Sequence, residues 1–209
     1  MDLRETRTIT ITRRIVLAAT LCAFAVILIC VLNGNAAGFD DPVREFFYGL
    51  RGPALTKAAI VITNTANALF IIALCIVLLI IPQTRKTFGV PLSIGTLGVT
   101  IINRIIKHVV MRPRPEVEHL VTEHGYSFTS GHSITSMFFY GMAIWLVWRY
   151  VENKTVRWIL TVLLAIPMLL VGPTRVYLGV HYPTDVLGGW CLGIAAIIVT
   201  IEIIRKVEA

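Results

Sequence analysis

The chain has 209 residues, of which 56% are hydrophobic and only 15% are charged, and its mean hydropathy is +0.77. This composition excludes a soluble domain of this length, because several apolar runs approach the ~20 residues that a helix needs to cross a bilayer. The net charge of +7 does not indicate a nucleic-acid partner, since the basic residues stand at the ends of apolar runs and form no basic tract. The sequence therefore predicts an all-α, polytopic membrane protein, a helical bundle that forms one domain over residues 1–209.

The first half of the chain contains three apolar runs. Residues 1–14 are polar, and they carry four arginines, Arg4, Arg7, Arg13 and Arg14. A first span is expected at 15–32, and we expect it to stay uncleaved because this run is longer than a usual signal sequence. Residues 39–57 mix charged and aromatic side chains and predict a short amphipathic helix at the membrane interface, with a plain polar loop as the alternative. A second span is expected at 58–81 and a third at 88–110.

The second half contains three more runs. Pro113 and Pro115 keep the third helix from continuing, and a long polar connection follows at 116–130. Further spans are expected at three places, residues 131–151, 156–171 and 183–204. Gly172, Pro173 and Gly179 suggest a bent connection after the fifth span. The prediction is therefore a bundle of six transmembrane helices with one interfacial helix.

Polar residues within the second span have a structural interpretation. Asn64, Thr65 and Asn67 stand in its first half, where we expect them to make helix–helix contacts. A short loop with Arg85 and Lys86 is expected to follow this span.

The basic residues predict the orientation of the bundle. With the N-terminus inside, the cytoplasmic side gains most of the basic residues, including Arg85, Lys86, Arg205 and Lys206. This bias predicts a multi-pass protein of the cell membrane with both termini, and the segment 1–14, in the cytoplasm. Four basic residues on the opposite, extracytoplasmic side stand beside polar motifs, so they suit binding better than topology.

The stretch TRVYLGVHYPTD, residues 174–185, places an arginine, a histidine and an aspartate between two apolar runs. Pro183 suits the first position of a helix, so Asp185 falls at the third position, from which its carboxylate can reach back to His181. An aspartate that holds one imidazole nitrogen leaves the lone pair of the other free for attack. Arg175 lies six residues before His181, and the bent connection would bring its guanidinium over the histidine. The alternative is an interfacial polar cluster that caps a helix.

Two further polar motifs lie at the same predicted membrane face. Lys107 and Arg114 are seven residues apart, about two helical turns, so both cations can face one way. Ser130 suits the N-cap of the fourth span, and Gly131 lets a ligand approach N–H groups that favour an anion. The alternatives are headgroup contacts for the cations and an ordinary helix start followed by an interfacial histidine, His132. These alternatives do not explain why the three motifs lie together, and this coincidence favours a binding site.

The three motifs, K-x6-R-P, S-G-H and R-x5-H-x3-D in this order, resemble the signature of the type 2 phosphatidic acid phosphatase family. In this sequence the signature comprises Lys107, Arg114, Pro115, Ser130, Gly131, His132, Arg175, His181 and Asp185. Thr129 and Thr174 stand where the family commonly has proline and serine, but neither difference removes a catalytic group. The chain is similar to the small bacterial members of the family rather than to the soluble haloperoxidases that share the motif.

The resemblance implies a metal-independent lipid phosphatase that needs no cofactor. It implies His181 as the nucleophile that forms a phosphohistidine, Asp185 as the residue that orients it, and His132 as the acid for the leaving group and later the base for water. We expect the phosphate oxygens to be held by three cations and by N–H groups, contributed by Lys107, Arg114, Arg175, Ser130 and Gly131. Acidic residues and histidines of the 116–130 loop could bind a divalent ion, but their spacing is nonspecific, so no metal site is predicted.

An apolar bundle around a cationic site suits a membrane lipid with a phosphate head and a hydrocarbon tail. Under the resemblance, the candidate substrates are undecaprenyl diphosphate, phosphatidylglycerophosphate and phosphatidic acid. One alternative is a phosphotransferase that passes the phosphoryl group or headgroup to another lipid. Another is a transporter or lipid-binding protein whose charges line a path, although the ionisable residues gather at one membrane face instead of near mid-span.

Overall fold

The computed structural model describes residues 3–208, with side-chain placement from residue 10 onward. Over this range the chain forms helices and no strands, so the predicted all-α class is confirmed. The elements in chain order are α1 (Leu3–Leu32), α2 (Ala37–Gly49), α3 (Pro53–Asn64), α4 (Ala68–Ile80), α5 (Pro82–Thr84), the π-helical turn η1 (Arg85–Gly89), α6 (Val90–Val110), α7 (Gly131–Tyr150), α8 (Lys154–Tyr177) and α9 (Pro183–Val207).

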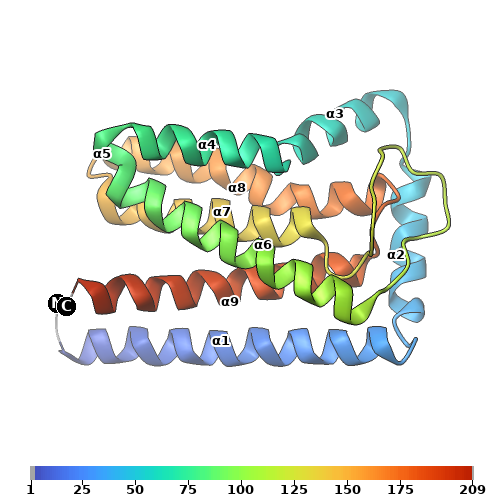
Figure 1. The fold of residues 1–209 in the computed structure, drawn as a ribbon, viewed down its shortest axis with the longest axis horizontal. Coiled ribbons are helices and arrows are strands. Elements are labelled where there is room, and N and C mark those ends of the chain that lie inside the picture. Colours follow the sequence, from blue (N-terminus) through green and yellow to red (C-terminus); the bar gives the residue numbers. More distant parts are fainter. Residues whose placement is uncertain (1–2, 209) are drawn as a thin grey trace.

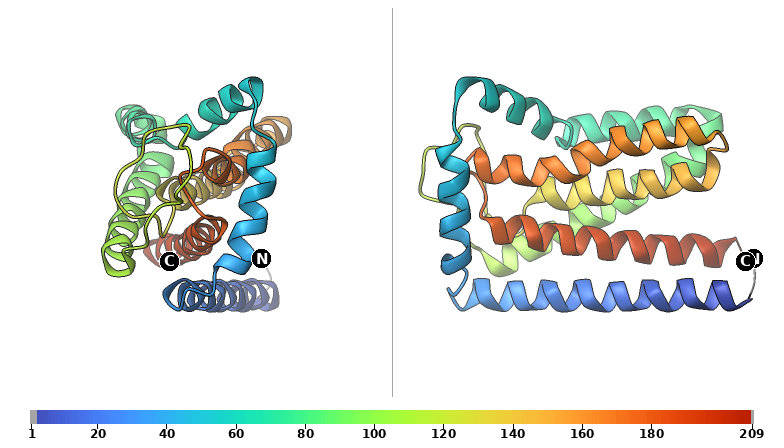
Figure 2. Two further views of the ribbon diagram at one scale, coloured as in Figure 1. Left: turned by 90° about the vertical axis from the view of Figure 1, so that its right-hand side faces the viewer. Right: turned by 180° about the vertical axis from the view of Figure 1, so that it is seen from behind.

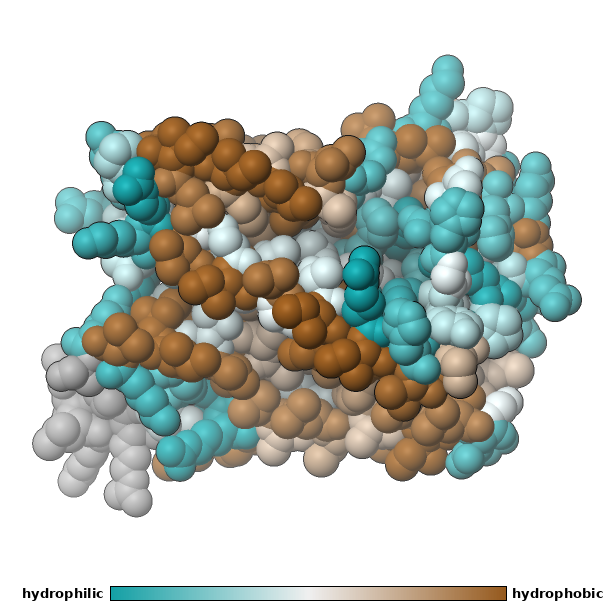
Figure 3. All heavy atoms as spheres, viewed as in Figure 1, coloured by the Kyte–Doolittle hydropathy of each residue, from teal (hydrophilic) through white to brown (hydrophobic). Residues whose placement is uncertain are grey.

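The long helices lie side by side along one direction, and α2 lies across one end of the bundle (Figure 1). The connection 111–130 covers the same end, whereas α1 begins and α9 ends at the opposite end (Figure 1 and Figure 2). Helix α7 packs against α6, α8 and α9, while α1 packs mainly against α9. On the face seen in Figure 3, hydrophobic residues cover the middle of the bundle and hydrophilic residues gather at its two ends. This distribution fits a bundle surrounded by lipid along its length.

Among the residues that the structure describes, four helices are long and apolar enough to cross a membrane, Thr10–Leu32, Pro82–Val110, Lys154–Tyr177 and Pro183–Val207. The bent pair α3 and α4 counts as a fifth if it is one broken span. Helix α7 has 20 residues but is not among these candidates, because its buried face carries polar side chains such as Ser133 and Ser136. The several apolar helices are therefore confirmed, but the predicted count of six spans is not.

The N-terminal part of the chain differs from the prediction in its boundaries. The structure has one continuous helix α1 from Leu3, in place of a separate polar segment 1–14 before the span. Arg13 of this helix donates to the carboxylate of Glu202 in α9 at 2.8 Å. The charge of Arg13, near one end of the apolar run, therefore has a partner. Residues 1–2 and the side chains up to residue 9, including Arg4 and Arg7, lie outside the described part of the chain.

The stretch 39–57 forms a helix, so the plain-loop alternative is wrong. The helix is shorter than predicted, because α2 ends at Gly49 and α3 begins at Pro53. The expected second span is broken as well, since α3 and α4 meet at an angle of 42°. Asn67 caps α4 by accepting from the N–H of Leu69 at 2.9 Å, and the backbone carbonyl of Thr65 accepts from Tyr140 at 2.7 Å.

Thr65 therefore makes the expected contact with another helix, α7, while Asn67 serves to start α4 after the break. The expected loop with Arg85 and Lys86 is helical instead, as the turn η1. Gly89 ends this turn against α4, where a Cβ would lie 2.8 Å from the carbonyl oxygen of Leu78.

The bent connection expected at Gly172 and Pro173 is wrong, because α8 continues to Tyr177. A Cβ at Gly172 would lie 2.6 Å from Val186 and 2.8 Å from Trp190, so the glycine serves close packing of α8 on α9. The hydroxyl of Tyr177 accepts from the N–H of Gly52 at 3.1 Å and holds the end of α8 in place. Tertiary packing thus outweighs the local tendency of this dipeptide to end a helix.

Candidate active site

The chain between α8 and α9 reverses direction at the end of the bundle that α2 covers. Gly179 has a φ of +81°, in the left-handed region that glycine adopts without strain. A Cβ at this position would also lie 2.8 Å from the carbonyl oxygen of Glu118, so the 111–130 connection passes directly over the turn. Two residues later His181 leads into Tyr182, the N-cap of α9.

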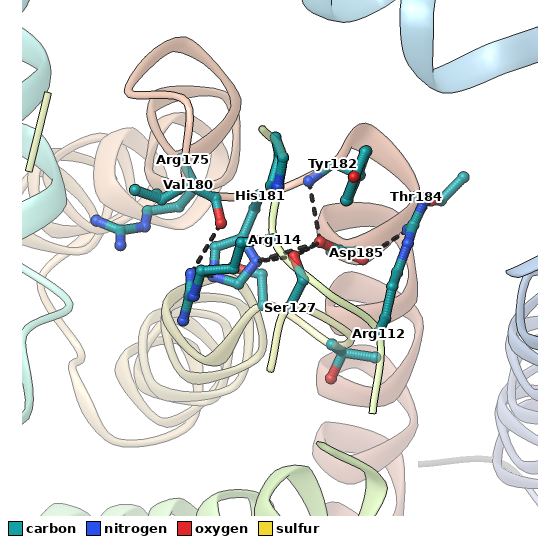
Figure 4. A network of polar contacts seen from close by, with 12 residues as sticks. Arg112, Arg114, Ser127, Arg175, Val180, His181, Tyr182, Thr184 and Asp185 are labelled. Atoms are coloured by element: carbon teal, nitrogen blue, oxygen red, sulfur yellow. Dashed lines mark hydrogen bonds and ion pairs between the residues drawn. The ribbon is translucent and has the colours of Figure 1, made fainter. Parts of the chain in front are cut away.

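His181 and Asp185 form a buried pair at the start of α9 (Figure 4). One carboxylate oxygen, Oδ2, accepts from the N–H of Tyr182 at 2.9 Å and lies 3.2 Å from Nδ1 of His181. The side chains of both members are at most 2% exposed. The predicted reach of Asp185 back to the entering chain is therefore confirmed. A carboxylate at Nδ1 favours the proton there, which leaves the lone pair of Nε2 available.

The environment of His181 favours its neutral form. Burial lowers the pKa of His181 to about 3, against the opposing effect of the carboxylate of Asp185. The imidazole is therefore uncharged at neutral pH, as a nucleophile has to be.

Arg114 contacts the other nitrogen of this histidine. Its guanidinium donates to the backbone carbonyls of Val180 at 2.8 Å, Gly125 at 3.0 Å and His124 at 3.0 Å. Nη1 lies 3.3 Å from Nε2 of His181. A positive charge is thus fixed beside Nε2, whose lone pair faces the guanidinium.

Lys107 lies at the end of α6 and points to the same segment. Its ammonium donates to the carbonyl of Tyr126 and to that of Ser127, the latter at 3.2 Å. Because Arg114 binds the carbonyls just before these two, both cations converge on residues 124–127. Their sequence spacing predicted such a common direction.

Arg175 is only 1% exposed, in the last turn of α8. It donates to the hydroxyl of Thr63 at 2.9 Å and to the carboxylate of Glu123. Glu123 also lies 3.6 Å from Arg114, so this carboxylate joins the two guanidinium groups. Arg175 therefore reaches the histidine through Glu123 and Arg114, and not from above it as the expected bend would have required.

Glu123 was not recognised from the sequence as a member of the site. The loop 116–130 carries several acidic residues without a diagnostic spacing, and only the fold shows which one meets the cations. Its Oε1 also lies 3.9 Å from Nδ1 of His132, the candidate acid in the first turn of α7. Within the part of the chain that the structure describes, no three His, Cys, Asp or Glu residues are placed to hold a metal ion.

Ser130 is the N-cap of α7, as predicted, and accepts from the N–H of Ser133 at 3.4 Å. The N–H of Ser130 itself donates to the backbone carbonyl of Asp185 at 3.1 Å. It is therefore not available to a phosphate, contrary to our expectation. The adjacent Thr129, which stands at the usual proline position, donates to Asn103 of α6 at 2.6 Å and so holds the loop on the bundle.

Gly131, the first residue of α7, stands at the lip of a groove. A Cβ there would lie 3.1 Å from the side chain of Asn103, so little space separates this helix start from α6. The groove has a volume of about 810 Å³ and runs between α4 and α6. Its sides are mostly apolar, whereas Lys107, Glu123 and His132 line its polar end.

Two residues that sequence reasoning missed contact Asp185 directly. Arg112 donates to Oδ1 at 2.7 Å, and the hydroxyl of Ser127 donates to Oδ2. Ser127 also lies 3.3 Å from Nδ1 of His181. Arg112 stands in the same R-P-R-P run as Arg114, which is the one signal that could have identified it.

The family model of the PAP2 superfamily matches residues 88–208, which include every motif residue described above. The chain is 30% identical over 182 residues to phosphatidylglycerophosphatase B of Bacillus subtilis, covering 84% of this chain and 88% of that protein. It is 31% identical over 144 residues to an undecaprenyl-diphosphatase of Sulfolobus acidocaldarius, covering 63% of this chain and 64% of that protein.

Two solved structures share the fold. The crystal structure of a transmembrane PAP2-type phosphatidylglycerolphosphate phosphatase from Bacillus subtilis has a TM-score of 0.83 and 23% identity, covering 91% of this chain and 96% of that one. The crystal structure of Aquifex aeolicus LpxE has a TM-score of 0.64 and 23% identity, covering 78% of this chain and 94% of that one.

Proposed function

The chain belongs to the PAP2 superfamily, it is a metal-independent lipid phosphatase like the relatives named above, and on this premise we propose which bond it cleaves and how. The proposed substrate is a membrane lipid with a phosphate monoester or diphosphate head. Phosphatidylglycerophosphate and undecaprenyl diphosphate are suggested by the names of the relatives, and phosphatidic acid has the same chemistry. The observation that carries the proposal is the buried His181, with a carboxylate on Nδ1 and a guanidinium beside Nε2.

The first half of the reaction transfers the phosphoryl group to the protein. Nε2 of His181 attacks phosphorus, and the bond from phosphorus to the lipid oxygen, or to the bridging oxygen of a diphosphate, breaks. Protonated His132 gives its proton to that leaving oxygen. Asp185 accepts the hydrogen bond of Nδ1–H and stabilises the positive charge that develops on the imidazole. The product is a phosphohistidine and a free lipid alcohol or lipid phosphate.

The second half hydrolyses the intermediate. His132 takes a proton from a water molecule, the water oxygen attacks phosphorus, and the bond from phosphorus to Nε2 breaks. Inorganic phosphate leaves, and both histidines return to their starting state. Throughout, Lys107, Arg114 and Arg175 supply the positive charge for the phosphoryl oxygens, which makes a metal ion unnecessary.

The groove between α4 and α6 supports a lipid as the substrate. Ile72 and Ile76 of α4 and Leu97 of α6 line it, while its polar end meets Lys107 and His132. A phosphate head at this end would place the hydrocarbon tail along apolar side chains. The three aliphatic residues are exposed, as expected for side chains that face lipid.

The arrangement in the membrane completes the proposal. Helix α7 would be the sixth span, because its 20 residues extend for about 30 Å, and α3 with α4 would form one broken span. Helix α2 would lie at the interface. We infer that the end of the bundle where α1 begins and α9 ends faces the cytoplasm, since basic residues such as Arg85, Lys86 and Arg205 accompany it. The site would then be extracytoplasmic.

Release of inorganic phosphate by the detergent-purified protein tests this function. The substrates would be undecaprenyl diphosphate, phosphatidylglycerophosphate and phosphatidic acid, each with a chelator present and with His181→Ala as the control. We expect release from at least one lipid, its loss in the variant, and an acid-labile phosphoryl label on the wild-type protein. Folded wild-type protein that released no phosphate from any of them would overturn the proposal, and release that required an acceptor lipid would point to a transferase.

A further inference from the structure

We propose that Arg112, anchored by Asp40 of α2, is a positioning residue that holds Asp185, and through it His181, in the orientation for attack. The inference rests on the proposed function, since it concerns the same histidine. Neither residue belongs to the three sequence motifs. Both lie behind Asp185, on the side opposite to the histidine, as the position of Arg112 in Figure 4 illustrates.

The guanidinium of Arg112 is fixed at both of its terminal nitrogens and on one face. Nη1 donates to Oδ1 of Asp185 at 2.7 Å and to the hydroxyl of Thr184 at 2.8 Å. Nη2 donates to Oδ2 of Asp40 at 2.7 Å. The ring of Tyr182 lies under the guanidinium, 3.8 Å from its carbon to the ring centroid. A planar group held in this way presents a donor to Asp185 from one direction only.

Asp40 ties this assembly to the helix that lies across the bundle. Its side chain is fully buried, and it accepts from the N–H of Thr184 at 2.9 Å and from the hydroxyl of Thr184 at 2.8 Å. Thr184 is the second residue of α9, so Asp40 binds the start of that helix and the guanidinium of Arg112 at once. The position of α2 therefore determines where Arg112 and the first turn of α9 lie.

These contacts fix the carboxylate of Asp185 through both of its oxygens. Oδ1 accepts from Arg112, while Oδ2 accepts from the N–H of Tyr182 and from Ser127 and faces His181. Rotation of the carboxylate would break the bond at Oδ1, so Arg112 sets the plane in which Oδ2 meets Nδ1 of the histidine. Groups that orient a catalytic pair in this way act through geometry and not through contact with substrate.

The charges support a functional reading of this cluster. Two fully buried carboxylates, Asp40 and Asp185, share the one guanidinium of Arg112. Burying such a set costs desolvation free energy, and apolar residues often stabilise a fold at least as well. The excess negative charge is useful beside His181, because it stabilises the imidazole when the phosphorus–nitrogen bond forms.

Kinetics of two variants and two matched controls test the inference. Arg112→Lys keeps the charge but cannot reach two carboxylates in one plane, and Asp40→Asn removes the negative charge that pairs with the guanidinium. Each should lower kcat by about 10- to 100-fold, with KM within about threefold of the wild-type value. The controls Arg13→Lys and Glu202→Gln make changes of the same kind in the pair that joins α1 to α9 at 2.8 Å, towards the opposite end of the bundle, and should behave as wild type.

A double variant separates positioning from general destabilisation. If Arg112 acts through Asp185, then adding Arg112→Lys to Asp185→Asn should lower the single-turnover rate by less than about twofold further. A loss by the full factor seen in the wild-type background would overturn the inference, as would a change in KM alone. Should Arg112→Lys fail to fold, Arg112→Gln, which keeps one donor for Asp185, takes its place in the same cycle.

The possible failures are distinguishable. Wild-type protein that releases phosphate while Arg112→Lys remains fully active would overturn this inference and leave the proposed function intact. Wild-type protein that releases no phosphate from any lipid would overturn the function and this inference with it.

Discussion

The two nitrogens of His181 face regions of different construction. On the Nδ1 side, Asp185, Arg112 and Asp40 form a buried network in which each carboxylate oxygen has a donor. On the Nε2 side, the carboxylate of Glu123 reaches two guanidinium groups, and its side chain is 24% exposed. The carboxylate oxygens of the first region are all paired with donors inside the protein. In the second region Glu123 lines the groove, so a phosphate that enters the groove can replace it as the partner of the guanidinium groups.

The two regions also differ in charge, because carboxylates outnumber cations on the Nδ1 side and cations outnumber carboxylates on the Nε2 side. Two carboxylates share one guanidinium on the Nδ1 side. On the other side Glu123 pairs with Arg114 and Arg175, and Lys107 adds a third cation that donates to backbone carbonyls. The Nε2 side therefore carries a net positive charge, which can balance the negative charge of a phosphate dianion. We therefore expect that separate sets of residues orient the histidine and bind the anion, which mutation can test one at a time.

Removal of His181, which both regions contact, should lower phosphate release more than any other change. His181→Ala eliminates the proposed nucleophile, and we expect phosphate release to fall by at least about 10⁴-fold, since the proposed covalent intermediate could not form. Single-turnover assays with labelled lipid phosphate would measure both release and the label retained on the protein. His119→Ala changes an exposed histidine of the neighbouring loop and should retain activity and label. A His181→Ala protein that still becomes labelled would place the nucleophile elsewhere.

A change on the Nε2 side should have the next largest effect. Arg114→Lys keeps a positive charge but loses the fork that lies beside His181, and we expect kcat/KM to fall by about 10²-fold, or ~2.7 kcal/mol. Arg51→Lys is the matched control, because Arg51 also bridges backbone carbonyls, those of Tyr177 and Glu118, at 3.1 and 3.2 Å. Equal losses in both variants would mean that Arg114 only holds the loop together.

Removal of the carboxylate of Glu123, on the Nε2 side, should strengthen phosphate binding instead of weakening it. Glu123→Gln frees Arg175 and Arg114 from a competing negative charge, so KM and the inhibition constant for inorganic phosphate should fall by roughly 3- to 10-fold. Inhibition of phosphate release at several phosphate concentrations measures this, and Glu118→Gln, an exposed position in the same loop, is the control. Weaker inhibition in Glu123→Gln would show that the carboxylate supports anion binding instead of competing with it.

Local sequence was sufficient for the parts of the site that local geometry determines. Pro183 at the first helical position and Asp185 at the third predicted the contact with His181, and Ser130 was correctly expected as an N-cap. The spacing of Lys107 and Arg114 likewise predicted their common direction. The first two features depend on the geometry of a helix start within one turn, which a sequence states directly. Arg114 lies beyond the end of α6 at Val110, so its shared direction with Lys107 comes from its contacts with the 111–130 connection and not from the helical period.

The features that the sequence missed depend on contacts between distant segments. Asp40 lies 144 residues before Thr184, and nothing in its own surroundings shows that it will meet α9. The continuation of α8 past Gly172 reflects packing against α9, which outweighs the local signal for a turn. Pairings and burial of this kind arise from the fold, so only a structure reveals them.

The smallest expected effect comes from the burial of His181 and appears in stability rather than in activity. The pKa of this histidine is lowered to about 3 in the folded protein, whereas a histidine in the unfolded chain has a pKa near 6.5. Between these values the unfolded state binds the additional proton, so the stability that the neutral histidine allows is fully present above pH 6.5 and is lost as the pH falls towards 3.

Lowering the pH from 7 to 5.5 should therefore cost the wild-type protein about 1 kcal/mol more than it costs His181→Gln, which cannot take up that proton. For a chain of 209 residues this corresponds to a difference of roughly 2–4 °C in the shift of the thermal midpoint. The two proteins would be melted at both pH values in the same detergent, and the wild-type midpoint should fall further. Because every other titrating group is common to both, equal shifts would mean that His181 takes up its proton as readily in the folded state as in the unfolded one. The Nδ1 side of His181 would then be open to water. That would contradict the closed network through which Arg112 is proposed to position Asp185 and His181.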